Sequence, residues 1–220
     1  MGQATRIKVC GLSDAAAARS AVAAGADYLG LVFAASVRQV TPATAESLVT
    51  AVPAAWVGVF VNPSLADAVA LTDRLGLAVL QLHGEETPAE CQAVRDATGR
   101  PVWKGLRWTG AADLLVPWAG AVDGVVLDAG AGAERGGTGR TLPWRTIGRM
   151  VPAARRPVPL ILAGGLGPDN VAIAIAAVRP DGVDGSSRLE RAPGRKDPAR
   201  IHAFVRAVRG AAPAAVAGAR

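Results

Sequence analysis

The chain has 220 residues, of which 50% are hydrophobic and 19% are charged, a composition typical of a soluble globular protein. Two cysteines are too few for a disulfide scaffold, and no apolar run is long enough to predict a membrane span. The net charge of +6 suits an arginine-rich surface or an anionic small substrate, and we expect no nucleic-acid partner because the few aromatic residues are not interleaved with basic runs. The low cysteine content suits a reducing compartment and residues 1–5 carry no signal pattern, so we expect a cytoplasmic protein.

Short apolar runs alternate with longer, alanine-rich stretches of helical period along the chain. In chain order, the sequence predicts a strand over residues 6–10, a helix over 14–26, a strand over 27–33, a helix over 41–52, a strand over 55–61, a helix over 64–76, a strand over 77–83, a helix over 87–99, a strand over 101–106, a helix over 110–118, a strand over 124–129, a helix over 142–150, a strand over 158–164, a helix over 167–178, a strand over 182–187 and a helix over 197–210. Ser13 is the predicted N-cap of the first helix and Gly25 its end.

This alternation predicts an α/β fold with a parallel sheet. The predicted strands are continuous apolar runs, which are typical of a parallel sheet covered on both faces. A doubly wound sheet and a (β/α)8 TIM barrel both fit such a pattern, and eight units without a linker favour the barrel. We therefore expect one barrel domain over residues 1–210, and we expect residues 211–220 to form an unstructured tail.

In such a barrel the chemistry lies at the carboxyl ends of the strands, so the polar residues there are the candidates for a functional site. They are Cys10, Ser36, Arg38, Asn62, His83, Glu85, Lys104, Arg107, Asp128, Gly164, Gly165, Asp184, Ser186 and Ser187.

The last two strand ends predict a phosphate site. Gly164 and Gly165 follow the seventh strand, and the predicted helix after them begins at residues 168–169, so backbone N–H groups and a helix N-terminus would face an anion. Ser186 and Ser187 end the eighth strand, and the loops after strands 7 and 8 commonly bind phosphate in barrels. The alternative is an ordinary tight turn, in which glycine is common.

Cys10 and Asp128 are the candidate proton-transfer groups. A cysteine at the mouth, near a phosphate site and helix termini, could have a lowered pKa and act as a base, although Cys10 taken alone better suits a packing role. Asp128 ends an apolar strand and could act as a general acid or serve a structural role. Cys91 lies on the apolar stripe of a predicted helix, which indicates a structural cysteine.

Other features are less informative. His83 has no histidine or cysteine cluster around it, so we expect no metal site, and no nucleophile elbow supports a serine hydrolase. The glycine-rich segment 132–144 predicts either a lid over a ligand or a surface loop.

Taken together, these motifs resemble the N-(5′-phosphoribosyl)anthranilate isomerase family of tryptophan biosynthesis. The stretches that carry the resemblance are IKVCGLS, GADYLGLVF, VGVFVN, LQLHGEE, VVLDAG with GGTGRTLPW, LILAGGLGPDNV, VDGSS and PGRKDPARIHAFV, and they span about residues 7–209 in order. The resemblance implies a single-domain barrel without a cofactor that performs an Amadori rearrangement on a phosphorylated small-molecule substrate, as a monomer or a homodimer.

The same resemblance implies roles for individual residues. Cys10 matches the family general base and Asp128 the family general acid. Arg38 and Asp184 match residues beside the anthranilate carboxylate and the sugar, and His83 is a further candidate for substrate binding. Gly164, Gly165, Ser186 and Ser187 would hold the phosphate.

Two departures from the family pattern leave alternatives open. Val37 stands between Ser36 and Arg38 where the family usually has Pro or Lys, and Arg188 stands where it commonly has glycine. If that position needs a positive φ, Arg188 would strain the turn; alternatively its guanidinium adds a phosphate contact. The alternatives are a related isomerase for a modified arylamine ribose phosphate, and a degenerate barrel that only binds a phosphorylated ligand. Cys10 argues against the bifunctional isomerases with two aspartates, and Lys104 alone does not make an indole-glycerol-phosphate synthase.

Overall fold

Eight parallel strands close into a barrel in the computed structural model, which describes residues 4–128 and 142–211. Hydrogen bonds join the strands in chain order, and β1 pairs with β8 to close the sheet. The strands are β1 (Arg6–Cys10), β2 (Tyr28–Val32), β3 (Trp56–Phe60), β4 (Val79–Leu82), β5 (Val102–Arg107), β6 (Gly124–Asp128), β7 (Leu160–Leu162) and β8 (Gly182–Gly185). The prediction of a (β/α)8 barrel is confirmed.

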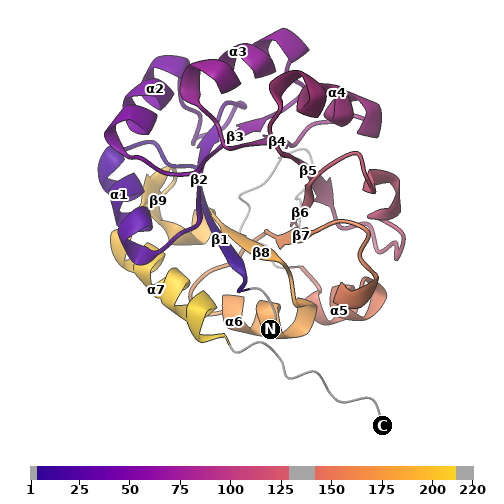
Figure 1. The fold of residues 1–220 in the computed structure, drawn as a ribbon. Coiled ribbons are helices and arrows are strands. Elements are labelled where there is room, and N and C mark those ends of the chain that lie inside the picture. The colour runs from indigo at the N-terminus through magenta and orange to yellow at the C-terminus, as the bar shows by residue number, and fades with distance from the viewer. Residues whose placement is uncertain (1–3, 129–141, 212–220) are drawn as a thin grey trace.

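Helices form the outer ring around these strands (Figure 1). They are α1 (Ala15–Ala24), α2 (Pro42–Ala51), α3 (Leu65–Leu75), α4 (Pro88–Thr98), α5 (Trp144–Met150), α6 (Val171–Val178) and α7 (Pro198–Gly210). α7 packs beside α1, so the last and first helices close the ring as β8 and β1 close the sheet. In the described part of the chain, no helix combines the length and the apolar character needed to cross a bilayer.

The strands are buried because helices cover the outer face of the sheet and side chains fill the barrel interior. Every residue of β3, β4, β6, β7 and β8 is buried, which matches their continuous apolar runs. A few buried side chains of the strands are polar rather than apolar, and they lie toward the carboxyl edge of the sheet. These buried polar side chains are the starting point for the functional site.

One of the two predicted end signals of the first helix is confirmed. Gly25 ends α1 in the left-handed conformation, with φ +94°. Thr87 caps α4 in a capping box with Glu90. The prediction that Ser13 caps α1 is wrong: the Asp14 side chain accepts the Ala17 N–H at 2.8 Å and takes that role. The Asp14 carboxylate also interacts favourably with the positive N-terminal end of the helix dipole.

The predicted helix over residues 110–118 is also wrong. Only a 3₁₀ turn, Val116–Trp118, forms in this stretch. Pro117 supplies no backbone N–H and disfavours helical φ/ψ at Val116, so the stretch cannot complete an α-helix. Leu115 is nonetheless buried and belongs to the hydrophobic core.

A short hairpin after β8 was not predicted. A 3₁₀ turn, Ser187–Leu189, follows the strand, and then β9 (Glu190–Ala192) pairs antiparallel with β10 (Arg195–Lys196). Most of the predicted glycine-rich segment 132–144, and the predicted tail beyond residue 211, lie outside the described residues.

Candidate active site

Cys10 and Asp128 end β1 and β6 at the carboxyl edge of the barrel. Both side chains are buried, with 7% and 8% of their surface exposed. Gly11 follows Cys10 with φ +77°, a left-handed conformation that glycine adopts freely. A Cβ on Gly30 would lie 2.7 Å from the Cys10 Sγ, so glycine on β2 leaves the space that the thiol occupies.

A buried ion pair lies next to Cys10. Lys8 precedes Cys10 by two residues on β1, so both side chains point to the same face of the sheet. The Lys8 Nζ donates to the Asp184 Oδ2 at 2.7 Å, and these two residues are direct partners in the β1–β8 register. The Asp184 Oδ1 is buried and has no hydrogen-bond partner among the described residues. It is therefore an open acceptor beside the candidate base.

The ionisation of Cys10 reflects opposing influences. Burial raises the pKa of the Cys10 thiol, and the Asp184 carboxylate adds to that rise. The Lys8 and Lys196 ammonium groups oppose it and lower the pKa of Cys10. The net effect is a raised pKa, so the expectation of a lowered value is wrong for the unliganded protein. The physical reason is that desolvation of the thiolate outweighs the attraction of the nearby cations.

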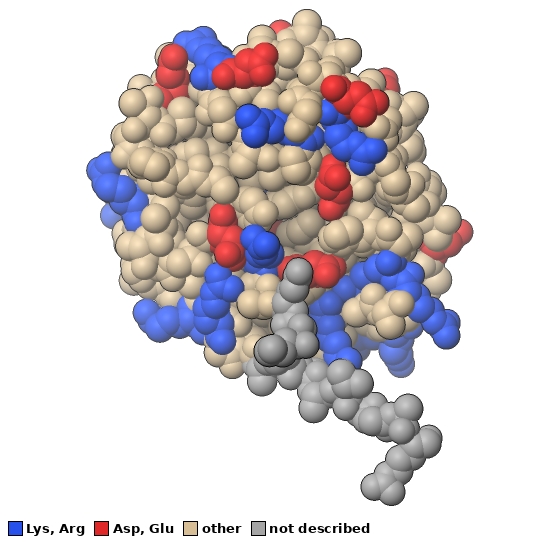
Figure 2. Space-filling model, viewed as in Figure 1, with Lys and Arg blue, Asp and Glu red and all other residues tan. Residues whose placement is uncertain are grey.

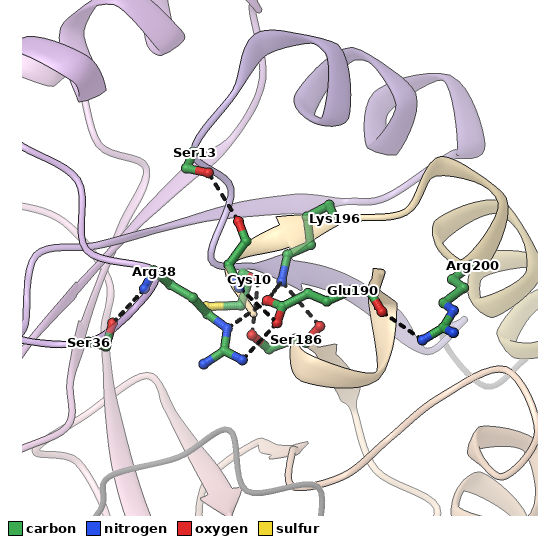
Figure 3. Close-up of polar contacts among 9 residues, drawn as sticks. Cys10, Ser13, Ser36, Arg38, Ser186, Glu190, Lys196 and Arg200 are labelled. Carbon is green, nitrogen blue, oxygen red and sulfur yellow. Dashed lines mark hydrogen bonds and ion pairs between the residues drawn. The ribbon is translucent and has the colours of Figure 1, made fainter. Parts of the chain in front are cut away.

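Arg38, Glu190 and Lys196 form a cluster on the same side of the mouth (Figure 3). The Arg38 Nε and Nη2 donate to the two Glu190 oxygens at 2.6 and 2.9 Å, a bidentate pair. The Lys196 Nζ donates to the Glu190 Oε1 at 2.7 Å and to the Ser186 carbonyl at 3.1 Å. One carboxylate therefore serves two cations. Arg38 lies where the sequence places it, at the mouth, with a guanidinium that Glu190 orients.

His83 lies on the opposite part of the mouth, after β4. Its Nδ1 is 3.1 Å from the Gln81 Nε2, and burial lowers its pKa, so the ring is neutral at neutral pH. A Cβ on Gly105 would approach the imidazole to 2.3 Å, so the glycine on β5 makes room for the ring. A neutral, oriented imidazole is suited to hydrogen bonding rather than to charge pairing.

A second buried ion pair, Lys104 with Glu86, acts electrostatically on His83. The Lys104 Nζ donates to the Glu86 Oε2 at 2.6 Å and to the Gly84 carbonyl at 2.7 Å. The Glu86 oxygens also accept the Asn62 and Gly84 backbone N–H groups at 2.7 and 2.9 Å. These bonds to Lys104 and to the backbone lower the pKa of Glu86 against the opposing effect of its burial. The pair ties together the loops after β3 and β4.

The loops after β7 and β8 contain the predicted phosphate residues. Gly164 and Gly165 have φ values of +81° and +63°, and the Asn170 side chain bonds the Gly165 carbonyl and the Gly167 N–H. The prediction that α6 begins at residues 168–169 is wrong, because this turn holds the chain until Val171. The Ser186 Oγ donates to the Cys10 carbonyl at 3.1 Å, which links the β8 end directly to the candidate base.

Arg188 does not strain the turn after β8. It lies inside the 3₁₀ turn, and outside glycine the described residues with positive φ are Asn62 and Arg179. The prediction of strain is therefore wrong. The Arg188 Nη2 instead pairs with the Asp169 Oδ2 at 2.7 Å, so its side chain spans the β7 and β8 loops.

Several residues of the site escaped the sequence analysis. They are Lys8, Gln81, Glu86, Glu190 and Lys196. The i, i+2 spacing of Lys8 and Cys10 was a readable signal, because a lysine inside an apolar strand needs a buried partner.

Within residues 4–128 and 142–211, no group of three or more His, Cys, Asp or Glu side chains could hold a metal ion. Acidic and basic side chains stand close together around the middle of the face in Figure 2.

Comparison with known proteins gives the family of this barrel. The sequence model described as N-(5′-phosphoribosyl)anthranilate (PRA) isomerase matches residues 7–207. The chain belongs to the PRA isomerase family. A relative from Geobacillus thermodenitrificans, described as N-(5′-phosphoribosyl)anthranilate isomerase, is 42% identical over 201 residues, which cover 89% of this chain and 90% of the relative.

Solved PRA isomerase structures share the fold. The Thermotoga maritima phosphoribosyl anthranilate isomerase is 30% identical and superposes with a TM-score of 0.81 over 94% of this chain and 99% of that chain. A phosphoribosyl anthranilate isomerase structure solved in complex with reduced 1-(o-carboxyphenylamino)-1-deoxyribulose 5-phosphate is also 30% identical, with a TM-score of 0.78 and coverage of 94% and 99%. The predicted family is confirmed.

Proposed function

We propose that this PRA isomerase family member converts N-(5′-phosphoribosyl)anthranilate to 1-(2-carboxyphenylamino)-1-deoxyribulose 5-phosphate, with Asp128 as general acid and Cys10 as general base. The observation that carries the proposal is the placement of these two buried groups on separate strands, β6 and β1, at one end of a closed barrel. An acid and a base that act on different atoms of one sugar need this separation. The substrate assignment rests on family membership and on the relative solved with a reduced form of the product.

Asp128 acts in the first step. Its carboxylic acid gives a proton to the ribose ring oxygen while the bond from that oxygen to C1′ breaks. The lone pair of the anthranilate nitrogen forms the C1′=N double bond, which yields a protonated Schiff base. Ring opening therefore leaves Asp128 as a carboxylate and places a positive charge next to C2′.

Cys10 acts in the second step. Its thiolate removes the C2′ proton, the C–H electrons form the C1′=C2′ double bond, and the C=N pair returns to nitrogen. The resulting enolamine tautomerises to the ketone when C1′ gains a proton and the C2′ hydroxyl loses one. The sequence uses no external oxidant or reductant, because C1′ is reduced as C2′ is oxidised. Each assisted proton transfer contributes typically ~10²–10⁴-fold to the rate.

Other residues bind and orient the substrate. Arg38 faces the anthranilate carboxylate with a guanidinium that Glu190 holds by two of its nitrogens. The open Asp184 Oδ1 accepts a sugar hydroxyl, and neutral His83 offers a further hydrogen bond. Backbone N–H groups around Gly164–Gly165 and Ser186–Ser187 bind the phosphate. No part of this scheme requires a cofactor.

The test is a coupled assay in which phosphoribosylanthranilate is generated in situ and its fluorescence loss is followed. The proposal predicts loss well above the uncatalysed rate, with release of the aminoketose product. Folded protein that gives no acceleration contradicts it. Acceleration only with a ring-substituted anthranilate derivative would identify the related isomerase for a modified arylamine. Binding of the reduced product analogue without turnover would identify a degenerate barrel.

A further inference from the structure

The charge balance around Cys10 is uneven, and the imbalance has a structural source. Lys8 and Asp184 form a one-to-one pair at 2.7 Å, so the pair as a whole carries no net charge. Arg38, Glu190 and Lys196 contain two cations for one carboxylate, which leaves one excess positive charge. This cluster therefore adds one net positive charge on this side of the mouth, beside the stronger direct influence of Lys8 on Cys10.

The charged side chains of this cluster are mostly buried and are held by hydrogen bonds. The side chains of Lys196 and Glu190 are almost fully buried, at 1% and 4% exposure, while Arg38 is 14% exposed. The β9–β10 hairpin positions both Glu190 and Lys196, whose backbones are register partners. Arg200 adds a bond from its Nη1 to the Glu190 carbonyl at 2.6 Å. A buried charge is screened little by salt, so its effect on a neighbour persists.

Two hydrogen bonds through Ser186 link Lys196 to the backbone of Cys10. Its Nζ donates to the Ser186 carbonyl, and the Ser186 Oγ donates to the Cys10 carbonyl (Figure 3). These two bonds connect β10, the end of β8 and the end of β1. Among the described residues Lys196 donates to two oxygens, which leaves one of its three N–H donors for a further acceptor.

We propose that Lys196, held by Glu190, is a positioning residue that stabilises the thiolate form of Cys10. The inference rests on the proposed function, in which that thiolate is the base. The groups that face Cys10 are Lys8 on β1, Asp184 on β8, and Lys196 on β10 with its partners Glu190 and Arg38. Loss of Lys8 would leave Asp184 as an unpaired carboxylate beside the thiol. Loss of Lys196 leaves Glu190 still paired with Arg38, so Lys196 is the cleaner probe.

Direct measurement of Cys10 ionisation tests this without substrate. A Cys91→Ala background removes the other thiol, which is fully buried and has its pKa raised to about 11. The rate of iodoacetamide alkylation, followed by intact mass from neutral to alkaline pH, gives the titration midpoint of Cys10. Lys196→Met and Lys104→Met are compared in that background, because Lys104 has the same kind of buried glutamate partner on the other side of the mouth.

The proposal expects Lys196→Met to raise the midpoint by about one pH unit or more, the usual effect of a close opposite charge. Lys104→Met should move it by much less. Equal midpoints in the two folded variants would overturn the proposal. Glu190→Gln gives a second test with the opposite sign: it removes a negative charge beside Lys196 and should lower the midpoint. If Lys196→Met fails to fold, an unchanged or raised midpoint in Glu190→Gln overturns the proposal.

The alkylation result is independent of turnover. If the wild-type protein lacks isomerase activity but Lys196→Met raises the midpoint, the proposed function fails and the role of Lys196 stands. If the wild-type protein is active, the acid limb of kcat/KM should shift to higher pH in Lys196→Met, in step with the alkylation midpoint. If the Lys196→Met variant is active and its alkylation midpoint is unshifted, the proposed function stands and the positioning role of Lys196 fails.

Discussion

Two buried lysine–glutamate pairs stand on opposite sides of the barrel mouth, and they differ in charge balance. Lys104 and Glu86 form a pair in which backbone N–H groups and a carbonyl complete the hydrogen bonding. Lys196 shares Glu190 with Arg38, so that side carries one cation more than it has carboxylates. A balanced, backbone-bonded pair stabilises loops, whereas an unbalanced one next to Cys10 changes the chemistry of a neighbour.

Breaking the two pairs should give unequal losses of stability. Lys104→Met leaves Glu86 buried without its cation and should lower the free energy of unfolding by about 3–5 kcal/mol. Lys196→Met should cost less, because Glu190 retains both bonds from Arg38. Urea denaturation of the two variants measures the difference. An equal loss, or a larger loss in Lys196→Met, would contradict the contrast between the two sides.

Asp128→Asn tests the acid on β6. The amide cannot protonate the ribose ring oxygen, so kcat should fall by at least ~100-fold. Steady-state kinetics, with circular dichroism to verify the fold, measure the effect. Near-normal kcat in the folded variant would remove Asp128 from the role of general acid.

Arg38→Met separates substrate binding from chemistry. Loss of a charged hydrogen bond to the anthranilate carboxylate is worth about 1.5–3 kcal/mol, so KM should rise ~10-fold or more, with a smaller change in kcat. Arg200→Met is the matched control, since Arg200 bonds the backbone of Glu190 from a half-exposed position. A similar KM in the two variants would show that Arg38 does not bind the substrate.

Arg188→Ala should have the smallest effect on stability. Arg188 and Asp169 are both exposed, and such pairs contribute ~0–1 kcal/mol. Urea denaturation of Arg188→Ala and Asp169→Ala should therefore give nearly the wild-type free energy of unfolding. A gain in stability on replacing Arg188 would revive the idea of strain at this turn.

The sequence predicts the barrel and the strand-end residues because each depends on local patterns. Apolar runs and capping residues predict the strands and most helices, and strand ends then place Cys10 and Asp128 at one edge. The predicted helix over residues 110–118 does not form because its apolar pattern is short and Pro117 disfavours helical backbone there. Local sequence patterns thus predict a strand or helix correctly where the spacing of apolar residues matches the buried face of that element.

The charge cluster could not be predicted in this way. Glu190 and Lys196 lie in an irregular stretch after β8. Their partner Arg38 is 152 residues before Glu190 in the sequence. No periodicity encodes such a contact, which depends on closure of the barrel between β8 and β1. Only Lys8, two residues before Cys10 on one strand, gave a local signal.

The most direct test of the account compares the two cysteines in the phosphoribosylanthranilate assay. Cys10 lies at the mouth, whereas Cys91 lies in α4 within the core. Cys10→Ser should lower kcat by at least ~100-fold, because a hydroxyl is a far weaker base than a thiolate near neutral pH. Cys91→Ser should keep most of the wild-type rate. Near-equal rates in the two folded variants would contradict the assignment of Cys10 as the base.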